Sequence, residues 1–362
     1  MQKVSRAVVV GVSGDNVRVD KTKVRPLFPV TRNLTYLNHA AVGPLSTRAC
    51  EAMERQARDQ RDFGALHWRA WDRELDETRV AAAKLLGAET AEVVILKNTS
   101  EGLSFVAEGY RWQGGDNVVT TAIEFPSNVA PWKNLARRGV ELRVARSQAV
   151  DAIEPLIDAR TRIVTVASVA FHNGAVADLE AIGELCAAKG VLFCVDAIQS
   201  FGALPVDVRR AKISFLAADA HKWVCGPEGA ATFFVAAEHL ERIEVLEYGW
   251  TNIVRHGSFL DAAPIPLPDA RRFQGGSPNT TGVCGLHAAL DLIHENGIES
   301  IAAEVVRLAT LLADRLDGAG FRVGSPRPIR SGIVGAVVED GRELLRLHAA
   351  LEKEGIVCSS AA

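Results

Sequence analysis

Residues 192–229 read LFCVDAIQSFGALPVDVRRAKISFLAADAHKWVCGPEG, and this stretch decides the fold class. It contains two apolar, strand-like runs that each lead to an acid. Residues 190–195 lead to Asp196, and residues 213–218 lead to Asp219. In an open parallel sheet, residues just beyond the carboxyl ends of the strands face the ligand crevice. The sequence therefore predicts a polar site at one edge of a sheet.

Polar residues of different chemistry follow both acids. Gln199 lies three residues after Asp196, and His221 and Lys222 lie shortly after the second acid. A lysine amine can form a Schiff base with an aldehyde cofactor. Pyridoxal 5′-phosphate (PLP) needs such a lysine and an acid for its pyridinium nitrogen, which makes Lys222 and Asp196 the candidates. An N-cap aspartate and a solvated lysine are the ordinary alternatives for these two residues.

The composition places the chain among ordinary globular proteins. It has 362 residues, of which 48% are hydrophobic and 23% charged, enough for one large domain and a smaller one. The net charge of −3 does not indicate a nucleic-acid-binding protein, for which a strongly basic surface is typical. No apolar run reaches the roughly 18 residues of a membrane helix. Residues 1–16 are interpreted as a tail or edge strand rather than a signal peptide.

The cysteines indicate a reducing compartment. All six are scattered, without a CxxC pair. Free thiols in the cytoplasm are the expected state, and the spacing predicts no structural zinc or other metal site.

Strand-like and helical patterns alternate along the chain, which predicts an α/β doubly wound sheet. The expected strands are residues 93–96, 118–121, 141–145, 162–167, 190–195, 213–218 and 229–235. The expected helices include one starting near Ser46, one over 72–86 that ends at Gly87, one over 178–189, one over 284–297 and one over 343–355.

Two motifs follow expected strands at the same edge. Thr99 and Ser100 follow the first strand and precede a helix, where free N–H groups and hydroxyls can bind a phosphate. An ordinary Ser/Thr N-cap is the alternative. Phe125 follows the next strand, where it can stack on a flat ring or simply belong to the core.

The order of several motifs resembles the class V aminotransferase family of PLP enzymes. The resemblance runs from Tyr36 to the C-terminus and is carried by YLNHAAVGPL, NTSEGLSFVA, EFPSNVAPW, VDAIQSFG, DAHKWVCGPEG and RFQGGSPNTTG. This family includes cysteine desulfurases, selenocysteine lyases, isopenicillin N epimerase and kynureninase. It implies the PLP-dependent transferase fold (aspartate-aminotransferase-like, fold type I).

The resemblance also implies a domain organisation. The expected parts are an N-terminal tail or arm over 1–34, a large PLP-binding domain over 35–265, and an interdomain helix with a small α+β domain over 266–362. The large domain should hold a mainly parallel seven-stranded sheet between helices. A homodimer with shared active sites is expected, without nucleic-acid or membrane partners.

Roles for the residues around the ring follow from the same resemblance. Lys222 matches the Schiff-base lysine, and Asp196 matches the partner of the pyridine nitrogen. Gln199 matches the residue near the phenolic oxygen, His221 matches a cofactor-site histidine, and Phe125 occupies the position above the ring.

The remaining matches concern phosphate and substrate. Thr99 and Ser100 match the phosphate turn. Ser277 matches a residue that reaches the phosphate of the neighbouring subunit. Asn38 and His39 match the loop near the substrate carboxylate.

Several departures from the family narrow the reaction. The desulfurases carry a histidine at the position of Phe125, and Phe125 cannot move a proton. Cys358 falls too early to match their nucleophilic cysteine, which disfavours a persulfide-forming desulfurase. No carboxylate-binding arginine follows Ile356, so the chain is expected to be truncated or to lack that contact, although Arg271 or Arg272 could substitute. Asp219 stands where a serine is common, near the phosphate.

The sequence thus predicts a PLP-dependent enzyme acting at Cα or Cβ of an amino acid. A lyase or epimerase is favoured by the resemblance of VASVAFHNG and EFPSN to that branch. Transamination is one alternative, and a PLP-binding but catalytically impaired scaffold or partner subunit is another. A nucleotide-dependent α/β enzyme is disfavoured, because no G-x-x-x-x-G-K-[ST] or G-x-G-x-x-G motif follows a strand.

Overall fold

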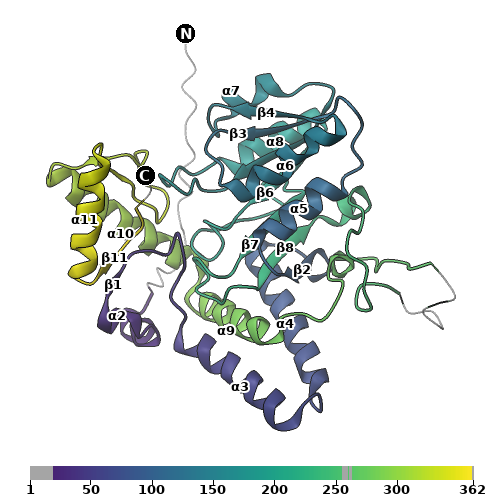
Figure 1. Ribbon diagram of the computed structural model, residues 1–362, viewed down its shortest axis with the longest axis horizontal. Coiled ribbons are helices and arrows are strands. Elements are labelled where there is room, and N and C mark those ends of the chain that lie inside the picture. Colours follow the sequence, from purple (N-terminus) through teal and green to yellow (C-terminus); the bar gives the residue numbers. More distant parts are fainter. Residues whose placement is uncertain (1–18, 255–259, 261–262, 361–362) are drawn as a thin grey trace.

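A seven-stranded sheet forms the centre of the protein (Figure 1). The computed structural model describes residues 19–254, 260 and 263–360, so the predicted tail over 1–16 lies outside the described residues. The strands are β2 (Val93–Leu96), β3 (Asn117–Thr121), β4 (Glu141–Ala145), β5 (Thr161–Ala167), β6 (Leu192–Asp196), β7 (Phe215–Asp219) and β8 (Ala231–Val235). Their order is β2-β8-β7-β6-β5-β3-β4. Only β8 runs antiparallel to its neighbours in this sheet, which confirms the predicted mainly parallel sheet.

Both faces of this sheet are covered by helices, which explains its apolar strands. Helices α5 (Thr99–Gly109) and α6 (Ala130–Asn134) pack on one face. Helices α4 (Trp68–Leu86), α7 (Val150–Ile153), α8 (Leu179–Lys189) and α9 (Thr280–Asn296) pack on the other. Along β6, Phe193 and Val195 enter the second core while Cys194 enters the first, as the two-residue period of a strand requires.

Helix boundaries follow local capping chemistry. Ser46 caps α3 (Thr47–Phe63), and its Oγ accepts the Ala49 N–H at 3.1 Å. Gly87 ends α4 in the left-handed region, with φ 67°. One expectation differs in detail: α5 is capped by Asn98, whose Oδ1 accepts the Glu101 N–H. The hydroxyls of the first turn of α5 are therefore not used as its cap.

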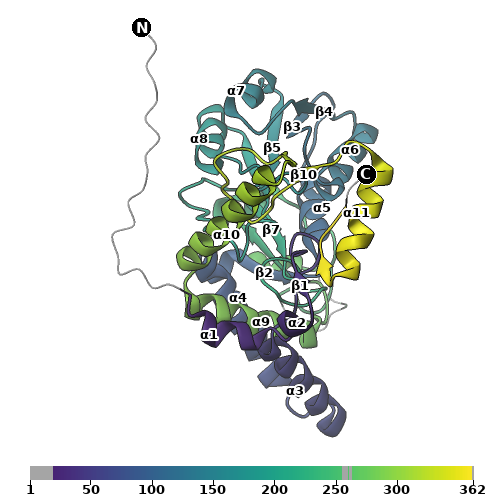
Figure 2. The same cartoon turned by 90° about the vertical axis from the view of Figure 1, so that its left-hand side faces the viewer.

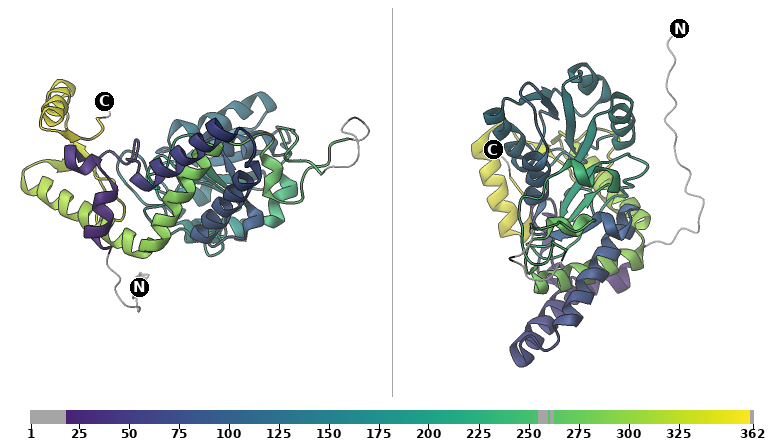
Figure 3. Two further views of the ribbon diagram at one scale, coloured as in Figure 1. Left: turned by 90° about the horizontal axis from the view of Figure 1, so that it is seen from below. Right: turned by 90° about the vertical axis from the view of Figure 1, so that its right-hand side faces the viewer.

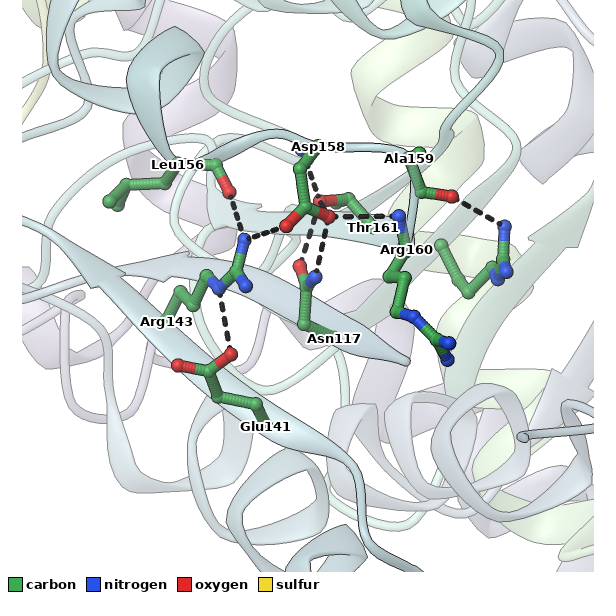
Figure 4. Close-up of polar contacts among 9 residues, drawn as sticks. Asn117, Glu141, Arg143, Leu156, Asp158, Ala159, Arg160 and Thr161 are labelled. Carbon is green, nitrogen blue, oxygen red and sulfur yellow. Dashed lines mark hydrogen bonds and ion pairs between the residues drawn. The ribbon is translucent and has the colours of Figure 1, made fainter. Parts of the chain in front are cut away.

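A polar network joins strands β3, β4 and β5 at their amino ends (Figure 4). The Asp158 carboxylate accepts hydrogen bonds from Arg143 at 2.7 Å, Asn117 at 3.0 Å and the Arg160 N–H at 2.8 Å. The Arg143 hydrogen bond is the main reason that the pKa of Asp158 lies well below its usual range. This network lies at the end of the sheet opposite the predicted site, and it holds the three strands in register.

The second part of the fold lies beside the large sheet (Figures 1 and 2). It contains α10 (Ile298–Gly318), an antiparallel pair of β9 (Arg322–Val323) and β10 (Ala336–Val337), α11 (Gly341–Lys353) and β11 (Ile356–Val357). Strand β11 pairs in parallel with β1 (Thr35–Tyr36). Sequence patterns did not identify α10 or this pairing. The domain boundaries stay a prediction.

Short elements complete the described chain, and α3 and α9 lie side by side beneath the sheet (Figure 3). The short elements are α1 (Lys21–Val24), α2 (Val30–Asn33) and the 3-10 turns Arg25–Leu27, Thr90–Glu92, Pro126–Asn128, Leu135–Arg138, Glu154–Leu156, Ala237–Arg242 and Ala270–Phe273. Among the described residues, every helix is too short or too polar to span a bilayer.

Candidate active site

The amine of Lys222 is the central group of the site. Lys222 follows β7 by three residues and is only 8% exposed. Its Nζ lies 5.4 Å from the centroid of the Phe125 ring. Within the described part of the chain, this amine has no hydrogen-bond or ion-pair partner. Burial lowers the pKa of Lys222, against the opposing charges of Asp196 and Asp219, and this favours the uncharged, nucleophilic form of the amine.

Asp196 supplies a buried carboxylate on the strand next to that of Lys222. It ends β6, pairs with Ala217 of β7 in register and is 2% exposed. Burial raises the pKa of Asp196 to about 6, although the Ile198 N–H, at 3.1 Å from Oδ1, and the charge of Lys222 oppose this. No side chain among the described residues donates to this carboxylate. Its free lone pairs can therefore accept a hydrogen bond from a protonated ring nitrogen.

The segment around Gly43 closes onto the backbone of the lysine loop. The Gly43 N–H donates to the His221 carbonyl at 2.6 Å. A Cβ on Gly43 would lie 1.9 Å from the Lys222 carbonyl oxygen, so only glycine allows this approach. The predicted substrate loop and the predicted lysine are thus in direct contact.

Gln199 and Trp223 extend this contact. Gln199 donates through Nε2 to the Ala40 carbonyl at 3.0 Å and accepts the indole N–H of Trp223 at 2.8 Å. The Trp223 ring stacks on His39, with centroids 5.5 Å apart. Within the part of the chain that the structure describes, the second amide N–H of Gln199 has no acceptor and can donate to a ring oxygen. Burial lowers the pKa of His39, so its imidazole is neutral at neutral pH.

The predicted phosphate turn lies at the same edge of the sheet. Ser100 Oγ donates to Ser127 Oγ at 2.8 Å, and both line a groove of about 600 Å³ beside α5. Thr99 Oγ1 accepts the Asp219 N–H at 3.0 Å, which leaves the Thr99 hydroxyl hydrogen free to donate. Asp219 Oδ1 lies 3.1 Å from Nδ1 of His221, without the geometry of a hydrogen bond. The unusual acid at position 219 therefore has the imidazole of His221 next to it.

Two residues beside Phe125 were not identified from sequence as site residues. Phe171 meets Phe125 edge to face, with centroids 5.3 Å apart. Glu124 is 8% exposed, and its carboxylate accepts from Thr121 at 2.6 Å, Asn128 at 2.8 Å and the Ala167 N–H at 2.7 Å. Glu124 also lies one strand from Asp196, because Ala167 is the register partner of Asp196. In the sequence, the position of Glu124 directly before Phe125 was the only indication that Glu124 belongs to the site.

The outer candidates occupy different places. Asn38 accepts a hydrogen bond from Ser359, which follows β11. Ser277 is exposed on the loop before α9 and has no hydrogen bond to the other candidate residues among those described. The structure thus gathers the candidates around Lys222 but leaves Ser277 at the surface.

The gathered residues fit PLP. An amine without a partner suits its aldehyde, the free lone pairs of Asp196 suit its ring nitrogen, and hydroxyls at the start of α5 suit its phosphate. Arg271 is paired with Asp269. Arg272 is paired with Glu241 and donates to the Leu267 carbonyl. Neither arginine belongs to this group. A separate trio of Glu74, Glu77 and His287 joins α4 to α9.

A mainly parallel sheet with a buried lysine and a buried acid at the ends of adjacent strands defines a fold-type-I PLP protein. Comparisons with known proteins agree. The family model described as aminotransferase class-V matches residues 35–360, and the chain belongs to this family. The family predicted from the sequence motifs, and with it a PLP-dependent enzyme, is confirmed.

Individual relatives point in the same direction. A protein of Methanothermobacter thermautotrophicus named "Probable cysteine desulfurase" is 33% identical over 291 residues, which cover 77% of this chain and 71% of that protein. The apo structure of a cysteine desulfurase from Thermococcus onnurineus NA1 aligns with a TM-score of 0.85 at 26% identity, covering 94% and 87% of the two chains. The cystine C-S lyase C-DES, in complex with its product cysteine persulfide, shares the fold with a TM-score of 0.85 at 23% identity, covering 91% and 90%.

Proposed function

We propose that this protein is a PLP-dependent lyase that breaks the Cβ–S or Cβ–Se bond of a cysteine-type amino acid. Family membership and the cysteine desulfurase relatives support this assignment. The observation that carries it is the buried amine of Lys222, which has no partner in the described chain and faces the ring of Phe125.

When bound, PLP supplies an aldehyde that captures amines and a ring that withdraws electrons from Cα. The residues of this chain do the rest. Lys222 would hold the cofactor through Nζ, and the same amine would accept the Cα proton. Asp196 would keep a proton on the ring nitrogen, and the second amide N–H of Gln199 would donate to the phenolic oxygen. The first turn of α5 and its hydroxyls would bind the phosphate.

Phe125 favours elimination over epimerisation. A two-base epimerisation needs a second group that moves a proton on the face opposite the lysine. The position that the family resemblance places above the ring is occupied here by Phe125, which carries no titratable atom. Transamination and a catalytically impaired scaffold stay open as outcomes of the experiment below.

The assembly and location belong to the same proposal. A homodimer with shared active sites is supported by the exposed position of Ser277, which leaves it available to a second subunit. A cytoplasmic location is supported by the six cysteines, all of which are unpaired.

The test combines trapping with turnover. Protein loaded with PLP is reduced with borohydride, and the modified peptide is identified by mass spectrometry. We expect the adduct at Lys222, its loss in Lys222→Ala and its retention in Lys84→Ala, since Lys84 is an exposed lysine on α4. Pyruvate release from cysteine, cystine and selenocysteine then measures elimination. An adduct without pyruvate, alanine or released sulfur or selenium would replace the lyase assignment by transamination, if the keto acid of the intact substrate forms, or by the impaired scaffold.

A further inference from the structure

The rings of Phe125 and Phe171 form an exposed apolar surface beside the reactive amine, here called the aromatic shelf. Phe125 is 41% exposed and Phe171 is 37% exposed. Their centroids are 5.3 Å apart at an interplanar angle of 81°. Lys222 Nζ lies over the Phe125 ring. The shelf therefore lies next to the amine that would hold an amino-acid substrate.

Apart from Lys222, no lysine or arginine among the described residues makes a cation–π contact with either ring. His172 meets the edge of Phe171 with centroids 5.3 Å apart, and burial lowers its pKa, so it is neutral at neutral pH. The nearby acids Asp196 and Asp219 carry the opposite sign. A substrate carboxylate placed against the two rings would exchange part of its water for apolar surface, which is unfavourable.

The thiols of the site do not offer a ready acceptor for sulfur. Cys225 lies in the lysine loop, where burial raises its pKa to about 12. Cys358 lies beside Ser359, and burial raises its pKa as well. Both stay protonated at neutral pH, and the thiolate is the nucleophilic form. Sulfur that leaves Cβ therefore needs no cysteine acceptor if it stays bonded to its own substituent and leaves as a thiol.

We propose that the aromatic shelf selects cysteine conjugates whose sulfur carries an apolar or aromatic substituent. This inference rests on the proposed lyase function and names its substrate class. Lys222 removes the Cα proton, and the Cβ–S bond breaks with its electron pair going to sulfur. The sulfur takes up a proton and leaves as a thiol, and one water molecule completes the conversion of the remainder to pyruvate and ammonium. No oxidant or reductant is needed.

The experiment compares two substituents on one amino acid. PLP-loaded protein is given S-benzyl-L-cysteine or S-carboxymethyl-L-cysteine, and kcat/KM is measured from pyruvate and thiol release. We expect a preference for the benzyl compound of roughly 10- to 200-fold, the range that apolar pockets achieve. Phe171→Ala should reduce that ratio about tenfold. Phe171→Arg should shift it toward the carboxymethyl compound, because arginine pairs with carboxylates.

The control is Phe321→Ala, which removes an equally exposed ring, 37%, next to β9. It should leave the ratio unchanged. If turnover is too slow, the dissociation constants of both conjugates are taken from the absorbance of the bound cofactor, so that the ratio is still measured. A ratio near one, or one that Phe171→Ala and Phe171→Arg do not move, overturns the substrate class while pyruvate from cystine leaves the lyase standing. Absence of the Lys222 adduct overturns both.

Discussion

Glu124→Gln should change how the stability of the apoprotein depends on pH. Burial, with a contribution from Asp196, raises the pKa of Glu124 from 4.5 to about 7 against three hydrogen bonds. Between these two values the folded state binds more protons than the unfolded state, so stability falls as pH rises through this window. This shift corresponds to about 3 kcal/mol, at about 1.4 kcal/mol for each pKa unit. Glutamine keeps the shape and removes the charge.

The hydrogen bonds of Glu124 explain why glutamine is the appropriate replacement. The amide oxygen can accept from Asn128 and the Ala167 N–H, while the amide NH₂ can donate to the Thr121 hydroxyl. The variant should therefore match the natural protein near pH 4.5 and exceed its stability by about 3 kcal/mol at pH 8.

Urea unfolding of both apoproteins at pH 5, 6, 7 and 8 measures this difference. Glu51→Gln, an exposed position on α3, serves as the control and should give a flat difference. Effects of Asp196 are present in both proteins and largely cancel. A difference that does not change with pH, or a variant that is less stable at pH 8 than at pH 5 relative to the natural protein, would refute the reasoning that burial dominates at Glu124.

Three further substitutions test the lysine loop and the acid. Gly43→Ala should lower stability by about 1–3 kcal/mol in urea unfolding and weaken PLP binding, because its Cβ collides with the Lys222 carbonyl; unchanged values would contradict this close contact. Asp196→Asn should keep the adduct at Lys222 but reduce kcat/KM about 10²-fold or more, since an amide carries no charge to hold the ring proton; activity within a few-fold of the natural protein would argue against that role. Trp223→Phe removes the N–H donated to Gln199 and should cost about 1 kcal/mol in urea unfolding, whereas no loss would show that water replaces the bond.

The positions of Asp196 and Lys222 were predictable because topology determines them. Residues that end adjacent parallel strands meet at one edge of the sheet, whatever the loops do. Most of the strands were recognisable because strands buried on both faces read as continuous apolar sequence, whereas the edge strand β4 is partly exposed. Recognising each apolar run required only the local sequence pattern.

Other features depend on the path of a loop, which local patterns do not encode. Phe171 reaches Phe125 only because the segment after β5 folds back, with Val169 bridged to Val176. Trp223 is next to Lys222 in the sequence, yet its contact with Gln199 depends on how the lysine loop turns. The pairing of β1 with β11 joins residues more than three hundred positions apart and leaves no periodic signal.

That pairing has a mechanical consequence. Tyr36 is in register with Val357, and Asn38, two residues further on, is bound by Ser359. The same short segment continues to Gly43, which is bound to the carbonyl of His221. A tilt of β11 must therefore be transmitted along about eight residues of backbone to the neighbour of the reactive lysine. Movement of the part of the fold that contains β11 is therefore coupled to the position of the Lys222 amine.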